Sequence, residues 1–362
     1  MFDHLDDPHG FDPNDSFRAA TRHRARRLHR RRAARRVAVA SALPIAGVVG
    51  AVVALDHRLD RVRRLETADS ASGADPLATG APVNLLALGW NPQRDVPIED
   101  RDPTVRFDSI VVVRLEGPTV SILSIPRDLW TGSGKLNSLP VDDLRTWLRT
   151  NLGIAVDHVV TMETAGLERL AEKVRPQVRL ELPVRDRHSG LDLPAGCQTL
   201  DGTKTVAYAR ARHLEDLPGG PDGWRLDRSG DLGRVARLQS LMVVAWSQLR
   251  RLGLGDLPGL IDILVDHAVV DDRLDNSDLV ALARRIRAAT SPPVTNMLPT
   301  ATAVSADGAS VLTVAPGDAA TATALEAVGG HLSHGAPTLP PAPLAGGEPP
   351  HAAWGLGQVS AC

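Results

Sequence analysis

The feature that most constrains the fold is a pair of short, largely β-branched apolar runs separated by only four residues. The runs are SIVVVRL at 109–115 and VSILSI at 120–125, and Glu-Gly-Pro-Thr at 116–119 joins them. Apolar runs of this length are typical of strands buried on both faces of a sheet. Because a parallel connection needs a dozen or more residues, the short link predicts an antiparallel hairpin.

Similar apolar runs alternate with helical patterns along the chain. VNLLALG at 83–89 predicts another buried strand. Helical spacing of apolar residues predicts helices at 142–152, 163–174, 235–249 and 276–289, the last capped by Asn276 or Ser277, and a final strand and helix at 310–314 and 319–328. The alternation predicts a three-layer α/β/α fold with a mixed central sheet.

A segment near the N-terminus has the composition of a membrane anchor. Residues 37–55 carry no charge and follow an arginine-rich stretch within 18–36. About 19 helical residues span roughly 28 Å, close to the hydrocarbon thickness of a bilayer. The positive-inside rule places the N-terminus in the cytoplasm and the rest of the chain outside the cell membrane. A cleaved signal peptide is the rival, although Ala54-Leu55-Asp56 is a poor cleavage site, and a basic DNA-binding arm is the third reading.

These patterns divide the chain into five parts. They are a cytoplasmic tail at 1–36, acidic and then arginine-rich, a single transmembrane helix at 37–55, a juxtamembrane stalk at 56–81, a folded domain at 82–328 and a Pro/Gly/Ala-rich tail at 329–362.

Charge and cysteine content exclude some functional classes. Lys and Arg number 41 and Asp and Glu 43, a net charge of -2, which argues against a nucleic-acid-binding protein. The two cysteines, Cys197 and Cys362, lack metal-ligand spacing, which argues against zinc. Outside the cytoplasm they could pair and pin the C-terminal tail to the domain; two free thiols are the alternative.

Charged residues stand at the ends of two predicted neighbouring strands. Arg106 and Asp108 begin one strand, and Arg127 follows the next. Ends of buried strands are where α/β proteins place ligands, because the strands give rigidity and the loops give access. The alternative is an Asp–Arg salt bridge that closes a sheet edge.

Four more arginines form two close pairs. Arg234 and Arg237 share a face at the start of a helix, where the helix N-terminus attracts anions. Arg210 and Arg212 share a face only if their segment is extended. Several guanidiniums directed at one point repel one another, and a polyanion would relieve that repulsion. A solvated charged face is the alternative to a phosphate site.

Six separated motifs resemble the LytR-CpsA-Psr domain over residues 82–328. They are VNLLALG, RFDSI, SIPRDLW, GKLN, SGLDLPAGCQTLDGTKTVAYARARH and DLGRVARLQ, in that order. The resemblance implies a hydrophobic tunnel for a polyprenyl chain, an arginine-lined mouth for its pyrophosphate, and Mg²⁺. Members transfer glycopolymers such as teichoic acids, capsules or arabinogalactan from a polyprenyl-pyrophosphate carrier to peptidoglycan, so the resemblance implies a phosphotransferase-type enzyme.

The resemblance also assigns roles by motif. Asp108 and Arg127 would be catalytic, and Asp108 would also be the magnesium ligand. The pyrophosphate would be held by Arg106, Arg127, Arg210, Arg212 and Arg234, with Arg237 and Lys135 as weaker candidates. No Ser-His-Asp nucleophile is required, because the acceptor sugar supplies the attacking hydroxyl, and we expect His158, His188 and His213 to be ordinary polar residues.

Three departures from the family pattern bear on catalysis more than on fold. Asn91 stands where the family has an aspartate, so we expect either weaker metal binding or substitution by Asp95, Asp100 or Asp102 as metal ligand. Leu238 replaces a glutamine, and an insertion at about 214–230 lengthens the loop before Asp231. A lipid pyrophosphate hydrolase and a non-catalytic lipid-binding or wall-assembly protein therefore remain alternatives.

Overall fold

The computed structural model describes residues 56–67, 76–91, 106–218, 223–249, 251–306, 308–315, 317–333, 336–337 and 362. The predicted cytoplasmic tail and membrane anchor lie outside the described residues, as does most of the predicted C-terminal tail. Within the described ranges, no helix combines the length and the apolar character needed to cross a bilayer.

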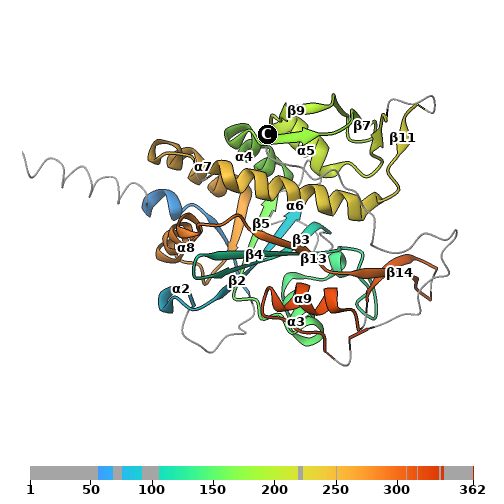
Figure 1. The fold of residues 1–362 in the computed structure, drawn as a ribbon. Helices are drawn as coiled ribbons and strands as arrows, with labels where there is room; N and C mark the ends of the chain where they lie inside the picture. The colour runs from blue at the N-terminus through green and yellow to red at the C-terminus, as the bar shows by residue number, and fades with distance from the viewer. Residues whose placement is uncertain are drawn as a thin grey trace, which may run out of the picture. The chain divides into compact units, whose positions relative to one another are not determined.

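A mixed seven-stranded sheet forms the centre of the fold (Figure 1). Its order is β1 (Arg63–Leu65), β12 (Ala268–Asp271), β5 (His158–Glu163), β2 (Val83–Trp90), β3 (Phe107–Glu116), β4 (Thr119–Ile125) and β13 (Val294–Met297). Strand β2 pairs antiparallel with β3 and parallel with β5, and β13 runs parallel to β4. The predicted α/β class with a mixed sheet is confirmed.

The hairpin between β3 and β4 is also confirmed. The strands pair antiparallel up to Glu116 and Thr119, so only Gly117 and Pro118 form the turn. Gly117 has a φ of 54°, a left-handed conformation that glycine adopts without the Cβ clash of other residues. Antiparallel pairing from this turn places the start of β3 beside the end of β4. Asp108 and Arg127 lie at this end of the hairpin, away from the turn.

One face of the sheet is covered by α3 (Val141–Leu152) and α9 (Ala319–Glu326) (Figure 1). Leu144, Leu148 and Leu152 recur every four residues along α3 and are completely buried in the main core. The helical spacing seen in the sequence thus corresponds to a buried stripe.

The other face is covered by α4 (Thr164–Val174), α5 (Gly202–Arg210) and α6 (Gly230–Leu249), with α7 (Leu257–His267) packed on α4 (Figure 1). Helix α8 (Asn276–Ala288) begins at a capping box in which Asp275 accepts a hydrogen bond from the backbone N–H of Asp278. The N-cap is therefore Asp275, and the expectation of Asn276 or Ser277 was wrong; aspartate also accepts this bond well.

The fold begins before residue 82. Arg63–Leu65, which we expected within the stalk, pairs in parallel with β12 as an edge strand of the central sheet. Helix α2 (Pro76–Thr79) also falls in that range and contacts α8. The sequence did not predict β1 because two of its three residues are arginines. The segment therefore contains no apolar run and has the composition of a linker.

Three smaller sheets flank the central one in the described part of the chain. The largest joins β7 (Val184–Asp186), β8 (Leu191–Leu193), β10 (Glu215–Asp216) and β11 (Arg225–Leu226). The insertion seen in the sequence supplies β10 and β11. The other two sheets are β6 (Gln177–Leu180) with β9 (Gly196–Thr199), and β14 (Thr300–Val304) with β15 (Ser310–Val314). Two short 3₁₀ helices, η2 (Leu136–Ser138) and η3 (Leu254–Asp256), complete the described elements.

A disulfide joins Cys197 in β9 to Cys362, with the two Cα atoms 5.8 Å apart. The pairing that the sequence left open is therefore present. Since the two cysteines are 165 residues apart in sequence, the bond fixes the C-terminal residue to the domain.

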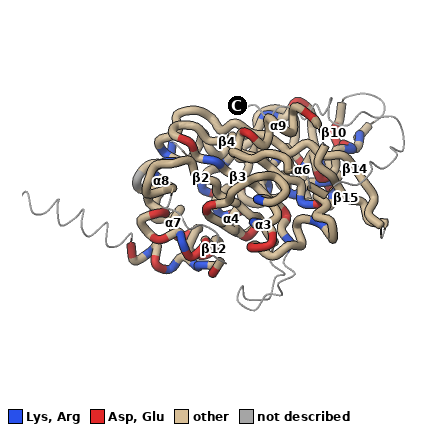
Figure 2. The backbone as a smooth tube through the Cα atoms, turned by 90° about the horizontal axis from the view of Figure 1, so that it is seen from below, with Lys and Arg blue, Asp and Glu red and all other residues tan. Residues whose placement is uncertain are grey.

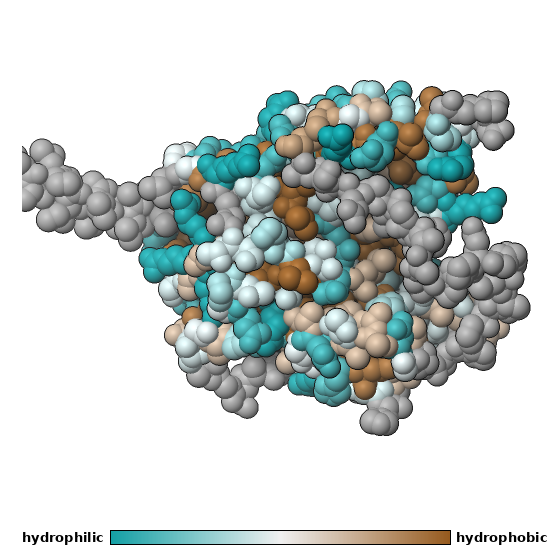
Figure 3. All heavy atoms as spheres, viewed as in Figure 1, coloured by the Kyte–Doolittle hydropathy of each residue, from teal (hydrophilic) through white to brown (hydrophobic). Residues whose placement is uncertain are grey.

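Charges of both signs are interspersed along the backbone (Figure 2), and on the face shown in Figure 3 apolar areas lie between hydrophilic ones. Many opposite charges pair locally, as Arg225 does with Asp216 at 2.7 Å on the small sheet.

Candidate functional site

A cavity of about 870 Å³ lies between the central sheet and helices α4, α5 and α6. Much of its wall is apolar. The sheet contributes Val111, Val160 and Met162, and the helices contribute Leu167, Val206, Leu238 and Met242. Such a wall suits an aliphatic ligand, because apolar surface gains free energy when it leaves water.

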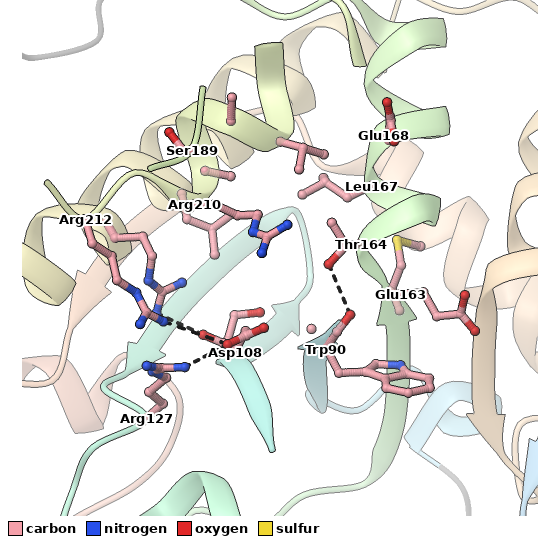
Figure 4. A pocket seen from close by; sticks show the side chains of 18 of the residues that line it. Trp90, Asp108, Arg127, Glu163, Thr164, Leu167, Glu168, Ser189, Arg210 and Arg212 are labelled. Atoms are coloured by element: carbon pink, nitrogen blue, oxygen red, sulfur yellow. Dashed lines mark hydrogen bonds and ion pairs between the residues drawn. The ribbon is translucent and has the colours of Figure 1, made fainter. Parts of the chain in front are cut away.

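Four arginines line this cavity, and Figure 4 shows the side chains of Arg127 and Arg212 beside Asp108 at one end of it. Arg127 follows strand β4, Arg210 is the last residue of α5, and Arg212 lies two residues beyond it. Arg234 lies in the second turn of α6. Arg127, Arg212 and Arg234, from three separate parts of the sequence, thus meet beside Asp108, and Arg210 lines the same cavity.

Asp108 is in contact with three of these arginines. Its Oδ1 accepts a hydrogen bond from Arg127 Nη1 at 2.7 Å and lies 3.9 Å from Arg212 Nη2. Its backbone oxygen accepts a hydrogen bond from Arg234 Nη2 at 2.9 Å. The predicted convergence of Asp108 with the arginines is therefore present.

A second carboxylate, Asp231, lies behind the same arginines. Its Oδ1 is 3.0 Å from Arg234 Nε, 3.1 Å from Arg212 Nε and 3.7 Å from Arg127 Nε. Burial alone would raise the pKa of Asp231, but the hydrogen bond from Arg234 and the charges of the three arginines bring the pKa below its ordinary value. We did not predict Asp231 as a site residue; its position one helical turn before Arg234 was the available signal.

Positive charge is in excess at this end of the cavity. The pKa of Arg212 is lowered by burial and by the neighbouring charge of Arg127, against the opposing effect of Asp231. Arg127 Nε is buried without a hydrogen-bond acceptor among the described residues. An anion with several oxygens would relieve the repulsion between these arginines.

Comparison with known proteins agrees with this geometry. Residues 51–324 match the LytR_cpsA_psr family. The chain belongs to this family. The match begins before residue 82, as the position of β1 in the central sheet requires.

Two curated proteins illustrate the relationship. The regulatory protein MsrR of Staphylococcus aureus (strain COL) is 26% identical over 181 residues, which is 46% of this chain and 49% of MsrR. The cell wall biosynthesis protein LcpA of Corynebacterium glutamicum is 29% identical over 216 residues, 48% of this chain and 39% of LcpA. The chain spans about half the length, or less, of these curated relatives.

Solved structures show the same fold. The LytR-Csp2A-Psr enzyme from Actinomyces oris is 24% identical with a TM-score of 0.57, covering 74% of this chain and 96% of that one. TagT bound to LI-WTA is 19% identical with a TM-score of 0.50, covering 72% and 91%. At these identities the likeness establishes the fold of this LytR_cpsA_psr protein and not its activity.

Three predicted binding residues of this family member are not among those that line the cavity. Arg106 is exposed directly before β3. Lys135 pairs with Asp128 at 3.0 Å. Arg237 is buried and donates to the backbone oxygen of Ala211. The structure thus brings together Asp108, Arg127, Arg210, Arg212 and Arg234, and gives Lys135 and Arg237 other contacts.

Two departures from the family pattern also have places in the structure. Leu238 points its apolar side chain to the cavity from α6, one turn beyond Arg234, and extends the apolar wall up to the arginines. Asn91 is exposed directly after β2. The three aspartates at 95, 100 and 102 that were considered as substitutes lie outside the described residues.

Glutamates stand at the opposite end of the cavity (Figure 4). Glu163 lies 3.5 Å from Arg63 Nη2 and 3.8 Å from His267 Nδ1, and Glu168 accepts a hydrogen bond from Thr203 at 3.0 Å. An anionic headgroup is therefore favoured beside the arginines and not beside the glutamates.

Two histidines that we expected to be ordinary polar residues line the cavity. The rings of His188 and His213 are 4.4 Å apart and tilted by 44°. The sequence predicted no role for them: His213 ends one of the family motifs and His188 directly precedes the same motif, but a linear pattern does not show that the two rings meet at the cavity. His158, in contrast, is buried beside Asp271 and does not line the cavity.

Asp108 fits as one ligand of Mg²⁺. Within the described ranges, no group of three or more His, Cys, Asp or Glu residues is placed to hold a metal ion. Mg²⁺ keeps several waters and is commonly bound through one or two carboxylates together with phosphate oxygens. The side chain of Asp108 is 44% exposed, so it can take part in such a site when a phosphate ligand supplies further oxygens.

Proposed function

We propose that this LytR_cpsA_psr protein transfers a glycopolymer from a polyprenyl-pyrophosphate carrier to peptidoglycan. One observation carries the proposal: an apolar cavity ends at four arginines that belong to three separate parts of the chain. The apolar wall would accommodate an aliphatic chain, and the arginines would bind a pyrophosphate headgroup. The relationship to the cell wall biosynthesis protein LcpA and the fold shared with TagT bound to LI-WTA support the same ligand class.

In this reaction an acceptor hydroxyl of the wall attacks the phosphorus that carries the glycan. A new P–O bond forms, the bond between the two phosphates breaks, and polyprenyl phosphate leaves with the electron pair. The hydroxyl proton passes to solvent or to the departing phosphate. Negative charge grows on the leaving oxygen, so fixed guanidiniums lower the barrier by stabilising the transition state more than the ground state.

Arg127, Arg212 and Arg234, which contact Asp108, and Arg210, which lines the same cavity, would together hold the pyrophosphate. Arginine keeps its proton at physiological pH, so the charge of this site does not depend on small changes in pH. Mg²⁺, held by Asp108 and by substrate oxygens, would neutralise further phosphate charge.

We also propose that residues 37–55 anchor the protein in the cell membrane with the catalytic domain outside. The disulfide between Cys197 and Cys362 supports this location, because disulfides persist in oxidising compartments and are rare in the cytosol.

The test uses the full chain in detergent micelles, mixed with a polyprenyl-pyrophosphate-linked sugar and peptidoglycan fragments, with and without Mg²⁺. Mass spectrometry follows the covalent product. We expect product in the complete mixture and its loss in Arg127→Ala. Release of free sugar phosphate in place of ligated product would establish a hydrolase, and retained lipid without turnover would establish a binding protein.

A further inference from the structure

The segment that carries Arg212 has little secondary structure of its own. Helix α5 ends at Arg210, and Ala211 has a non-helical backbone with φ −58° and ψ 121°. Arg212 and His213 belong to no helix or strand. The side chain of Arg212 nevertheless contacts both Asp108 and Asp231. Residues from other parts of the chain must therefore hold the backbone of Arg212 in place.

Asp186, the last residue of β7, binds this segment from one side. It has no exposed surface. Its Oδ2 accepts the backbone N–H groups of Arg212 at 2.8 Å and His213 at 2.9 Å, and its Oδ1 accepts those of His188 at 2.8 Å and Ser189 at 3.2 Å. Burial pushes the pKa of Asp186 upward, but these backbone donors hold it below the ordinary value, so the group is ionised.

Arg237 binds the same segment through a carbonyl. Its side chain is 5% exposed, its Nη2 donates to the backbone oxygen of Ala211, and its Nη1 lies 3.4 Å from Asp227. A buried carboxylate thus holds two N–H groups of the segment, and a buried guanidinium holds the carbonyl that precedes them. Buried charges of this kind are costly unless they are compensated. Asp186 is compensated by four backbone N–H groups, and Arg237 by Asp227 and the Ala211 carbonyl.

We propose that Asp186 and Arg237 are positioning residues that fix Arg212 at the mouth of the cavity. The proposal rests on the proposed function, because Asp186 and Arg237 would affect binding of the pyrophosphate ligand only by positioning Arg212. It also gives Arg237 a role different from the direct pyrophosphate contact that its motif implied.

The decisive variant is Asp186→Asn, which keeps the shape of the side chain. One carboxylate oxygen becomes an NH₂ donor, and in either orientation that donor faces two backbone donors. One pair of N–H groups therefore loses its acceptor. Asp192→Asn, at an exposed position on the adjacent strand β8, is the matched control.

The experiment is a double-mutant cycle with the full chain in detergent, using geranylgeranyl pyrophosphate as the probe and calorimetry to measure affinity. We expect Asp186→Asn to weaken binding about tenfold, and to weaken it less than twofold further in a chain that already carries Arg212→Ala. Non-additivity of this kind marks residues that act as a unit. Arg237→Lys should give the same pattern if Asp186→Asn does not fold.

Equal losses in both backgrounds would show a general structural role and overturn the proposal, as would unchanged affinity in Asp186→Asn. A separate measurement needs no ligand: amide hydrogen exchange at Arg212 and His213 should accelerate in Asp186→Ala, which removes both acceptor oxygens, and not in Asp192→Ala. If the unmutated chain fails to bind the probe, the proposed function fails. Unaltered exchange in Asp186→Ala would contradict the positioning role itself.

Discussion

Arg127 Nη1 donates a 2.7 Å hydrogen bond to Oδ1 of Asp108, which joins the end of β4 to the start of β3. Asp108 lies in β3, and Arg127 lies two residues after β4, the neighbouring strand of the hairpin, so the pairing of these two strands brings the residues close together. A phosphate oxygen would compete with Asp108 for the same guanidinium. The pair thus combines an anion-binding group with a carboxylate able to take a metal ion in exchange.

Replacing Arg127 should therefore weaken ligand binding. Hydrogen bonds to charged groups contribute about 1.5–3 kcal/mol, which corresponds to a loss of about 10- to 150-fold in affinity for geranylgeranyl pyrophosphate in Arg127→Ala. Arg149→Ala, at an exposed position of α3 on the opposite face of the sheet, is the control. Calorimetry that finds equal affinities for the two variants would exclude Arg127 from the site.

Changes in the apolar wall should act on the lipid and not on its headgroup. Met242→Gln places a polar amide where the chain would lie, and each CH₂ that loses its apolar contact costs about 0.8 kcal/mol. We expect a weaker affinity for geranylgeranyl pyrophosphate, by about tenfold, and the same affinity for inorganic pyrophosphate. Parallel losses for both probes would mean that the lipid does not occupy this cavity.

Magnesium should bind only together with a phosphate ligand. Because Asp108 provides too few oxygens alone, Mg²⁺ should raise the affinity for inorganic pyrophosphate in the unmutated chain and have little effect on the free protein. Asp108→Asn should abolish the magnesium effect while it retains pyrophosphate binding through the arginines. Titrations with and without EDTA measure the pyrophosphate affinity in the absence and presence of Mg²⁺. A magnesium effect that survives Asp108→Asn would mean that Asp108 does not bind the metal.

The disulfide should stabilise the fold. In the chain-entropy model a closed loop of 100 residues contributes about 4.7 kcal/mol to stability, an upper figure for most real bridges. Cys362→Ser should lower the free energy of unfolding in urea by up to about this amount, and a reductant should produce the same loss in the unmutated chain. A reductant effect that persists in Cys362→Ser would assign the stabilisation to another cause.

Acid should destabilise the protein through Asp186 and Asp231. Both have a pKa below the ordinary value of 3.8, so near that pH the folded chain binds fewer protons than the unfolded chain. Their contribution is complete above pH 3.8 and is lost as the pH falls through the lowered pKa of the folded state. Urea unfolding at a series of pH values should show a shallower acid loss for Asp186→Asn than for the unmutated chain.

The parts of the fold that the sequence predicted are those with a clear apolar pattern. Strands β2, β3 and β4 are long apolar runs, and the stripe on α3 recurs at helical spacing. Strand β1 could not be found in this way, because its neighbours in the sheet, and not its own composition, make it a strand. Short strands such as β13, whose partner β4 lies far away in sequence, escape detection for the same reason.

The residues of the candidate site also divide into those that the sequence predicted and those that depend on contacts made only in the folded chain. Asp108 and the four arginines of the cavity were predicted, because family motifs carry them. The roles of Asp186 and Arg237 depend on neighbours 26 residues away in each case, and a linear pattern does not show which backbone groups a buried charge will meet.

The position of β1 limits how far the folded domain can move from a membrane anchor. If residues 37–55 cross the membrane as proposed, only about seven residues separate the anchor from the first strand of the sheet, at most about 25 Å of fully extended chain. Strand β1 would then stay close to the bilayer surface, and a lipid-linked ligand would not have to leave the membrane entirely to reach the domain.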